Sequence, residues 1–465
     1  MNKNIVKMAV LIFSAFAVVI LYQTYIQVFQ GNYLLNHPRN RRLQVLEEAV
    51  TRGSILDRNG RVLAKTEGVD KAKKRIYPYG EVTSNITGYL SRRYGRCGLE
   101  STYNQSLLGL SGGLSGGDFW SLQRVSSGQR GNDIILSLDA SLQEQAYRLL
   151  GSRKGAVIAI EPSTGRVLAM VSRPGFDPKG VDSNWETLKV NPDSPLLNRA
   201  TQGLYPPGST MKVVTAAGIL GIQPATVGRV FEAPGFITVE GMRIEDKQAI
   251  GRMNFIQAFA RSSNYVFATL GIEQGVTVLF DTARKFGIGR NIPFDITTGE
   301  GDLPDPLGIS KLELAESAIG QGRVMVTPLN MVLIAAGLAN GGQVMTPTLV
   351  DEIRDASGSV ISRSQPKLMF TAVTKSVADT LVKLMTAVVS GGTGVEATIS
   401  GIQVAGKTGS AQNPHGQPHA WFIGFAPAGK PKVAVAVIIE NGGPGGREAA
   451  PVAREIMKTV IGTKR

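Results

Sequence analysis

The chain has 465 residues, a formal net charge of +14 at pH 7 and a hydrophobic content of 43%. This length and composition predict two or three folded domains with a sizeable core, and they exclude the disordered and fibrous classes of protein. The basic excess fits a nucleic acid, an anionic membrane, an anionic substrate or a solvated basic face, and composition does not choose among them.

Cysteine and histidine are scarce in this sequence, with one cysteine, Cys97, and three histidines. A single thiol allows no intramolecular disulfide, and no Cys/His cluster has the spacing of zinc ligands. None of the histidines lies in a motif typical of a Ser-His-Asp triad, so a nucleophile in this protein is expected to use another base. We expect neither a metal nor a cofactor.

Residues 1–30 are predicted to form an N-terminal tip and a transmembrane anchor. No charged residue occurs between Lys7 and Arg39, and the apolar stretch 8–29 would reach about 33 Å as a helix, enough to cross a hydrocarbon core. A cleaved signal peptide is the alternative, but the apolar run is longer than usual and no small-x-small cleavage site follows it. Basic residues flank both sides, so the charge rule does not predict the orientation.

Residues 31–150 are predicted to form a separate domain of mixed structure. Turn signals recur along this segment, among them "DRNGR" at 57–61. The Gly/Ser-rich run at 109–118 predicts an exposed loop. A helix capped by Asp139 or Ser141 is expected at the end of the segment, at the entry to a second domain.

The second predicted domain, residues 151–465, begins and ends with paired strands. Two β-branched runs within 155–172 are separated by a Pro-Ser-Thr-Gly turn, which predicts a hairpin, and a similar pair occupies 420–441. Several helical patterns lie between the two pairs. This order predicts an α+β domain whose antiparallel sheet is assembled from distant segments of the chain.

A serine and a lysine follow a Pro-Pro-Gly turn in "YPPGSTMKVV". The turn at 206–208 cannot continue a helix backwards, so a helix is predicted to start around Ser209. Lys212 lies three residues later on the same helix face, within hydrogen-bond reach of the Ser209 hydroxyl. Burial and the helix N-terminus would lower the pKa of Lys212, so that its neutral amine could activate Ser209 for attack on a carbonyl.

This Ser-x-x-Lys pattern is weak evidence when it stands alone. An ordinary helix N-cap explains Ser209 equally well, and the pattern recurs at 364–367, where a proline argues against a helix. The glycine-rich "GGTG" at 391–394 adds no support for phosphate binding, because it lacks the Lys-Ser/Thr of a phosphate-binding loop.

Two further polar motifs follow in a fixed order. The first, Ser262-Ser263-Asn264, opens an apolar helix pattern. The second, Lys407-Thr408-Gly409, ends a strand-like run, and its small residues would let a substrate lie along the strand edge and pair with its backbone. Together and in this order, Ser-x-x-Lys, Ser-x-Asn and Lys-Thr-Gly are the signature of the penicilloyl-serine transferases.

The sequence therefore resembles the class B penicillin-binding proteins over nearly its whole length. "RGSILDRNGRVLA" at 52–64 looks like the N-terminal motif of that class, and "GLESTYNQSLLG", "GAVIAIEPSTGRVLAM" and "HAWFIGFAP" match its usual phrasing. The resemblance implies an α+β transpeptidase domain at 151–465, with helices around a five-stranded antiparallel sheet plus a helical subdomain. It also implies an elongated pedestal domain of the dimerisation type at 31–150, and one membrane span with a cytoplasmic N-terminus and an extracytoplasmic catalytic domain.

The resemblance also implies roles for the residues of the three motifs. Ser209 would be the acylated nucleophile and Lys212 its general base. Ser262 would relay a proton between Lys212 and the leaving amine, and Asn264 would orient Lys212 and the substrate amide. Lys407 would supply positive charge for the substrate carboxylate and tune Ser262.

The substrate-binding residues implied by the resemblance are Thr408, Gly409 and Ser410. The hydroxyls of Thr408 and Ser410 would bind the substrate carboxylate, and the backbone N–H groups of Ser209 and Ser410 would form the oxyanion hole. Many relatives have threonine in place of Ser410, but either hydroxyl can serve this purpose.

The implied reaction is peptidoglycan D,D-transpeptidation through an acyl-enzyme, with covalent binding of β-lactam antibiotics at the same serine. The substrates would be stem peptides on lipid-linked or nascent glycan. A polytopic glycosyltransferase of the shape, elongation, division and sporulation (SEDS) family is the implied partner. No motif supports binding to nucleic acid.

Other activities on the same fold remain as alternatives. A D,D-carboxypeptidase or a β-lactamase would pass the acyl group to water, and the motifs do not separate these from a transpeptidase. A β-lactam sensor would be non-enzymatic, but sensors usually carry several spans and a signalling domain. A bifunctional enzyme with its own glycosyltransferase is disfavoured, because the segment between the anchor and the catalytic domain is too short to hold one.

Overall fold

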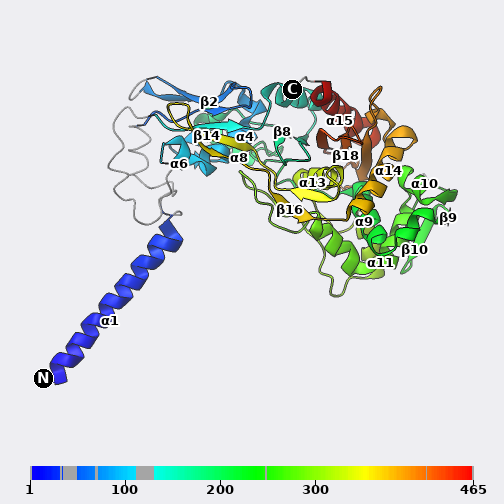
Figure 1. The fold of residues 1–465 in the computed structure, drawn as a ribbon, viewed down its shortest axis with the longest axis horizontal. Coiled ribbons are helices and arrows are strands. Elements are labelled where there is room, and N and C mark those ends of the chain that lie inside the picture. Colours follow the sequence, from blue (N-terminus) through cyan, green and yellow to red (C-terminus); the bar gives the residue numbers. More distant parts are fainter. Residues whose placement is uncertain are drawn as a thin grey trace.

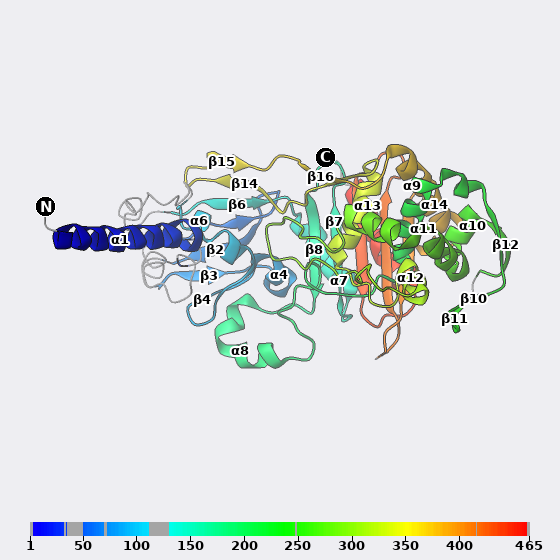
Figure 2. The same ribbon diagram turned by 90° about the horizontal axis from the view of Figure 1, so that it is seen from below.

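A computed structural model describes residues 3–31, 34, 50–68, 72–110, 130–246, 249–414 and 416–462. From residue 111 onward, the predicted Gly/Ser-rich loop lies outside these described residues. Figures 1 and 2 show an N-terminal sheet, a second sheet and a helical region ending in β9 to β12, which follow one another along the long axis.

The N-terminal helix is the candidate membrane anchor. α1 (Lys3–Tyr25) continues without interruption into a π-helical segment, η1 (Ile26–Gln30). The combined 28-residue helix is apolar, and its most apolar stretch is not buried against the rest of the described chain. By length and composition it could cross a membrane, as the sequence predicts.

The N-terminal region is built on a mixed six-stranded sheet. In spatial order its strands are β15 (Val360–Arg363), β14 (Val350–Arg354), β6 (Asp133–Leu136), β1 (Ile55–Leu56), β2 (Val62–Glu67) and β3 (Lys74–Ile76). β1 and β6 are parallel, and the other pairs are antiparallel. β14 and β15 come from the second predicted domain. The chain therefore returns to this sheet after the helix Pro328–Ala339 and before the three strands within 405–439.

A buried ion cluster stabilises this N-terminal region. The Glu100 carboxylate accepts from Arg52 Nε and Arg75 Nε, at 2.6 Å each, and the Glu100 side chain is fully buried. Burial alone would raise the pKa of Glu100, but the two guanidinium groups lower it below its usual value. The cluster joins "RGSILDRNGRVLA" to "GLESTYNQSLLG", two of the segments that carry the family resemblance.

The predicted five-stranded antiparallel sheet is confirmed. In spatial order its strands are β17 (Ala405–Ala411), β18 (His419–Ala426), β19 (Val433–Ile439), β7 (Gly155–Ile160) and β8 (Val167–Arg173). Both predicted strand pairs are antiparallel neighbours, and β19 pairs with β7 to join the two ends of the domain.

Two helical layers cover the two faces of this sheet, so its strands are buried on both sides. α7 (Ala140–Leu150) and α15 (Gly445–Gly462) pack with Val433, Val435 and Val437 of β19. The alternate residues of β19 belong to the core cluster on the other face, which contains α13 (Pro328–Ala339). Asp139 is the N-cap of α7, because its carboxylate accepts from the backbone N–H groups of the first turn.

The remaining elements connect the two sheets or form the helical region. The helices are α4 (Ser84–Thr87), α5 (Gly98–Thr102), α6 (Asn104–Leu107), α8 (Val181–Val190), α9 (Lys212–Ile222), α10 (Phe255–Ala260), α11 (Asn264–Lys285), α12 (Lys311–Ala318) and α14 (Lys375–Gly391). The strands are β4 (Leu90–Ser91), β5 (Gly95–Arg96), β9 (Val230–Ala233), β10 (Phe236–Val239), β11 (Met242–Glu245), β12 (Gly251–Asn254), β13 (Gln343–Met345) and β16 (Leu368–Thr371).

Candidate active site

The candidate nucleophile Ser209 lies in a 3-10 turn, η7 (Gly208–Met211), and the α-helix proper begins at Lys212. The predicted helix start around Ser209 is therefore confirmed, with a first turn of the 3-10 type. Gly208 has φ = +53°, and the Thr210 hydroxyl donates to the Pro207 carbonyl at 2.6 Å, so the chain tightens before the helix starts.

Close backbone contacts hold this turn on two sides. The Gly208 N–H donates to the Gly320 carbonyl at 2.8 Å, and a Cβ on Gly320 would lie 2.0 Å from the Gly208 oxygen. On the β17 side, a Cβ on Gly409 would lie 3.0 Å from the Pro207 oxygen. The turn that carries Ser209 is thus held between Gly320, where a side chain has no room, and the Lys-Thr-Gly strand, where a side chain at Gly409 would be tightly packed.

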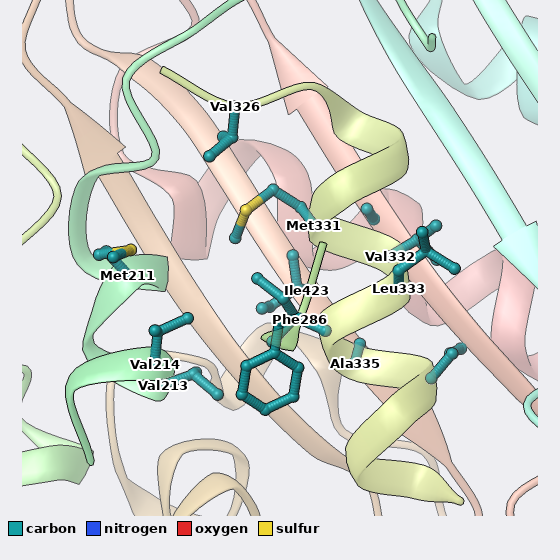
Figure 3. Packing of buried hydrophobic residues seen from close by; sticks show 14 of the residues in the cluster. Met211, Val213, Val214, Phe286, Val326, Met331, Val332, Leu333, Ala335 and Ile423 are labelled. Carbon is teal, nitrogen blue, oxygen red and sulfur yellow. The ribbon is translucent and has the colours of Figure 1, made fainter. Parts of the chain in front are cut away.

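The start of α9 is also anchored in the hydrophobic core. Met211 and Val214 belong to the same buried cluster as Met331 of α13 and Ile423 of β18, as Figure 3 shows. Burial of these side chains fixes the helix whose first residue is Lys212. The packing of the core thereby determines where the Lys212 side chain starts.

The Lys212 side chain is fully buried beside the Ser-x-Asn motif. Its Nζ donates to the Ser262 carbonyl at 2.6 Å, to Ser262 Oγ at 3.2 Å and to Asn264 Oδ1 at 2.7 Å. Among the described residues these bonds replace the predicted direct bond to Ser209. Burial lowers the pKa of Lys212 to about 7, and the negative charge of Asp246 opposes this shift.

A second buried amine meets the same hydroxyl. Lys407 Nζ donates to Ser262 Oγ at 2.9 Å and to the Thr408 carbonyl at 2.9 Å. Burial, followed by the nearby charge of Lys212, lowers the pKa of Lys407 well below its usual value. Ser262 Oγ therefore lies between two amines, and Ser262 itself has a left-handed backbone with φ = +60°.

The Lys-Thr-Gly strand lies at the edge of the sheet. β17 pairs with β18 on one side, with Lys407 opposite Ile423 and Ser410 opposite Ala420, and it is the terminal strand in the sheet order. This edge therefore carries four predicted site residues in sequence, namely Lys407, Thr408, Gly409 and Ser410. The edge has no strand partner among the described residues. Such an edge can take up an extended peptide.

Two side chains near this site have no signal in the sequence analysis. Asp246 is a buried carboxylate that contacts the Ser-x-Asn turn. Thr393 Oγ1 lies 2.6 Å from Thr408 Oγ1, and the Thr393 N–H donates to the Ala260 carbonyl at 3.2 Å. Thr393 lies in the "GGTG" stretch, whose glycines suggest only a phosphate loop. Its contact with Thr408 depends on tertiary packing, so the sequence contains no local signal for it.

The structure thus brings the three predicted motifs together at one site. Cys97 is not part of it: burial raises the pKa of its thiol to about 11, and its core neighbours lie in the N-terminal region and around α8. Within the described ranges, no group of three or more His, Cys, Asp or Glu side chains could hold a metal ion.

Two protein-family models match the chain. The model described as the penicillin binding protein transpeptidase domain matches residues 155–458. The model described as the penicillin binding protein A dimerisation domain matches residues 52–133.

Curated relatives are similar over most or all of the chain. The peptidoglycan D,D-transpeptidase PbpA of Mycobacterium tuberculosis is 34% identical over 99% of this chain and 99% of its own length. The peptidoglycan D,D-transpeptidase MrdA of Acinetobacter baumannii is 31% identical over 85% of this chain and 67% of its own length.

Solved structures give the same result for the fold. The ceftriaxone acyl-enzyme complex of penicillin-binding protein A from M. tuberculosis has a TM-score of 0.82 at 34% identity, covering 90% of this chain and 100% of that chain. Its penicillin G acyl-enzyme complex has a TM-score of 0.81 at 33% identity, covering 88% and 99%.

Proposed function

This chain belongs to the penicillin-binding protein transpeptidase family and is a serine-type peptidoglycan D,D-transpeptidase that binds penicillin, and we propose that Ser209 is the residue acylated in both reactions. The observation that carries this assignment is the pair of buried lysines that share Ser262 Oγ beside the Ser209 turn. A serine followed one turn later by an amine with a pKa of about 7 has a base suited to neutral pH.

In the first step, the neutral amine of Lys212 takes the proton of Ser209. The Ser209 oxygen then attacks the carbonyl of the penultimate D-Ala of a stem peptide. The resulting oxyanion is stabilised by the backbone N–H groups of Ser209 and Ser410. Ser262 passes the proton to the departing amine, so the terminal D-Ala leaves and an ester remains on Ser209.

In the second step, an amine from a neighbouring stem peptide attacks the ester and restores the Ser209 hydroxyl. The two acyl transfers replace one direct amide exchange with two lower barriers. With a β-lactam, attack on the ring carbonyl opens the ring and leaves the drug attached to Ser209.

The substrate carboxylate is assigned to the Lys-Thr-Gly strand. Lys407 contributes positive charge there, and the hydroxyls of Thr408 and Ser410 donate hydrogen bonds to the carboxylate. Gly409 between them lets the strand lie close to the Pro207 turn that precedes Ser209, and its backbone is assigned to the substrate peptide. Asn264, whose Oδ1 accepts from Lys212 Nζ, holds the amine in place and orients the substrate amide.

The placement of the protein in the cell is proposed from its family and from its N-terminal apolar helix. Residues 1–30 anchor it to the membrane with the N-terminus in the cytoplasm, residues 31–150 form a pedestal and residues 151–465 form the extracytoplasmic catalytic domain. The strands β14 and β15 cross back into the pedestal sheet and connect the two parts. Glycan polymerisation is assigned to a polytopic SEDS glycosyltransferase, with which this chain would act in the membrane.

A product analysis tests the proposed reaction. Purified full-length protein is incubated with uncross-linked nascent glycan, and the stem peptides are then separated by mass. Dimeric stem peptides and released D-Ala are expected for the native chain, and neither for Ser209→Ala. Release of D-Ala without dimers would instead identify a carboxypeptidase, and full activity of Ser209→Ala would exclude Ser209 as the nucleophile.

A further inference from the structure

A buried carboxylate lies behind the Ser-x-Asn motif without being part of it. Asp246 follows β11 directly and is only 3% exposed. Its Oδ2 accepts from Ser263 Oγ at 2.5 Å and from the Tyr265 N–H at 2.8 Å. No salt bridge neutralises it among the residues that the structure describes, so its charge is held by these two donors.

Glu245, the residue before Asp246, fixes the side-chain amide of Asn264. The Glu245 carbonyl accepts from Asn264 Nδ2 at 2.8 Å, which leaves Asn264 Oδ1 to accept from Lys212 Nζ at 2.7 Å. An amide has distinct donor and acceptor ends, so the bond to Glu245 determines which end faces the lysine. Glu245 and Asp246 together thus hold residues 263–265, at the start of α11.

The β10–β11 hairpin that carries these contacts is held at both ends. At its base, the Asp246 N–H donates to the Gly235 carbonyl at 2.8 Å. At its tip, Glu240 Oε2 accepts from the Leu312 N–H at 3.0 Å, in the first turn of α12. The position of the carboxylate is therefore set by the hairpin and by α12, independently of the helix that carries Ser209.

Asp246 also balances charge in a site with two buried amines. Its carboxylate raises the pKa of Lys212, although burial has the larger and opposite effect. The other charged group at Lys212 is Lys407 of β17, and the uncharged groups are Ser262, Asn264 and the Phe267 ring. Among the described residues, Asp246 is thus the negative charge that acts on Lys212.

We propose that Asp246 is a positioning residue of the transfer reaction, which holds the start of α11 at Ser263 and Tyr265 and supplies a negative charge beside the buried amine of Lys212. It acts through Ser263 and Tyr265 and does not contact the substrate. The proposal rests on the roles proposed above for Ser209 and Lys212, and it adds a fixed charge to the three sequence motifs.

Asp246→Asn in the full-length, detergent-extracted protein tests this proposal. The asparagine keeps the size of the side chain and one acceptor but removes the charge. The second-order rate of acylation by a fluorescent penicillin is measured between about pH 5.5 and pH 9. In the native chain, this rate should rise with pH through about 7, as Lys212 loses its proton.

Two changes are expected for Asp246→Asn. Loss of the negative charge lowers the pKa of Lys212, so the midpoint of the rise should move to lower pH by at least about half a unit. Both donors bond to one oxygen, Oδ2, which the asparagine carbonyl can replace, so the two bonds become neutral and weaker and the plateau rate should fall by several-fold. An unchanged midpoint would overturn the charge role.

Matched variants separate position from charge. Ser263→Ala keeps the Asp246 charge but removes its donor, so the plateau should fall while the midpoint stays. Glu232→Gln removes an exposed carboxylate that pairs with Arg252 and contacts no residue of the turn, so neither quantity should change. A native plateau rate in Ser263→Ala would overturn the positioning role.

Two checks keep this result distinct from the proposed function. Ser209→Ala should lose labelling at every pH, and labelling of that variant would refute the proposed role of Ser209 as the nucleophile, whatever Asp246 does. If Asp246→Asn shows no cooperative thermal transition, the plateau of Ser263→Ala decides: a fall supports the positioning role and a native rate overturns it.

Discussion

Lys212 is the residue on which the proposed chemistry depends most. Its amine is fully buried, and three oxygen acceptors from Ser262 and Asn264 surround it. Burial brings its pKa to about 7, so a substantial fraction of the amine is neutral at neutral pH and able to accept a proton. A lysine with an ordinary pKa would be protonated almost entirely and would make a poor base.

Lys212→Arg tests whether this lysine must lose a proton. A guanidinium remains protonated at any accessible pH, so acylation by a fluorescent penicillin should fall by roughly 10²- to 10⁴-fold, with no recovery at high pH. Lys375→Arg, at an exposed ion pair with Asp379 on α14, is the matched control and should react at the native rate. A variant that regains activity with rising pH would contradict the assignment of Lys212 as the base.

Thr393 is expected to act through the hydroxyl of Thr408. If Thr408 donates to the substrate carboxylate, its oxygen is free to accept from Thr393 Oγ1, 2.6 Å away. Thr393→Val should therefore weaken carboxylate recognition by about 1 kcal/mol, or several-fold in the second-order rate of penicillin acylation. Thr393→Ser should keep the native rate, and equal rates in the two variants would contradict this role.

The sequence motifs identify the reactive side chains of the site but not the residues that hold them in place. Ser209, Lys212 and Lys407 carry hydroxyls and amines in recognisable motifs, so the sequence alone was enough to propose roles for them. Asp246 and Thr393 lie in stretches without any catalytic pattern, and they reach the site only through tertiary contacts with Ser263 and Thr408. Contacts of this kind depend on where separate elements pack, which a local pattern does not contain.

At the scale of elements, the two strand pairs of the catalytic sheet were predictable, because β-branched runs flank short turns at 155–172 and 420–441. The helix start around Ser209 was predictable from the Pro-Pro-Gly turn, but the 3-10 form of its first turn was not, because that form depends on the backbone of Gly208 and on the Thr210 side chain. The pairing of β14 with β6 joins Ile353 to Ile134, and such distant pairings leave no local trace in a sequence.

Gly320 is the element-scale test of how the nucleophile turn is held. It has φ = +78°, and a Cβ there would lie 2.0 Å from the Gly208 oxygen, so Gly320→Ala must displace the turn. The left-handed backbone alone costs about 1–2 kcal/mol with a side chain, and displacement of Ser209 should slow acylation by roughly 10²-fold. Thermal unfolding and penicillin labelling measure the two effects.

Gly221→Ala is the matched control for that variant. Gly221 lies in α9 with open space around its Cβ position, so alanine should stabilise the fold by about 0.5–1 kcal/mol and leave labelling unchanged. If Gly320→Ala has the native unfolding temperature and the native rate of penicillin labelling, the close contact between Gly320 and Gly208 does not hold the turn.

At the scale of the whole molecule, side-chain contacts tie the N-terminal region to the catalytic domain. The Tyr103 hydroxyl donates to Asp295, and Asp295 Oδ2 accepts from the Leu349 N–H at 2.7 Å and the Val350 N–H at 3.1 Å. These bonds meet where β14 enters the N-terminal sheet. The N-terminal region and the catalytic domain are thus joined by shared strands and by partly buried polar contacts.

Glu100 is expected to be essential for the N-terminal region. Glu100→Gln would leave Arg52 and Arg75 without their shared counter-charge, so the free energy of unfolding should fall by about 3–5 kcal/mol. Because the folded pKa of Glu100 is lowered, its stabilising effect is present above about pH 4.5 and is lost as the pH falls through the folded pKa. Native stability should therefore decline more steeply in acid than that of the variant.

Glu67→Gln is the control for this measurement, because Glu67 forms an exposed pair with Lys65 on β2. Such surface pairs contribute about 0–1 kcal/mol, so thermal unfolding of this variant should be close to native. Equal stabilities of Glu100→Gln and Glu67→Gln would show that the buried cluster does not stabilise the fold.

The position of the penicillin adduct tests the central claim most directly. Full-length protein is reacted with penicillin G, digested with trypsin and mapped by mass; cleavage after Arg199 and Lys212 places Ser209 in the peptide 200–212. We predict a penicilloyl group on Ser209 in this peptide, no adduct on the peptides of Ser262 or Ser410, and no adduct in Ser209→Ala. An adduct at another residue, or an equal mass shift in Ser209→Ala, would contradict the account.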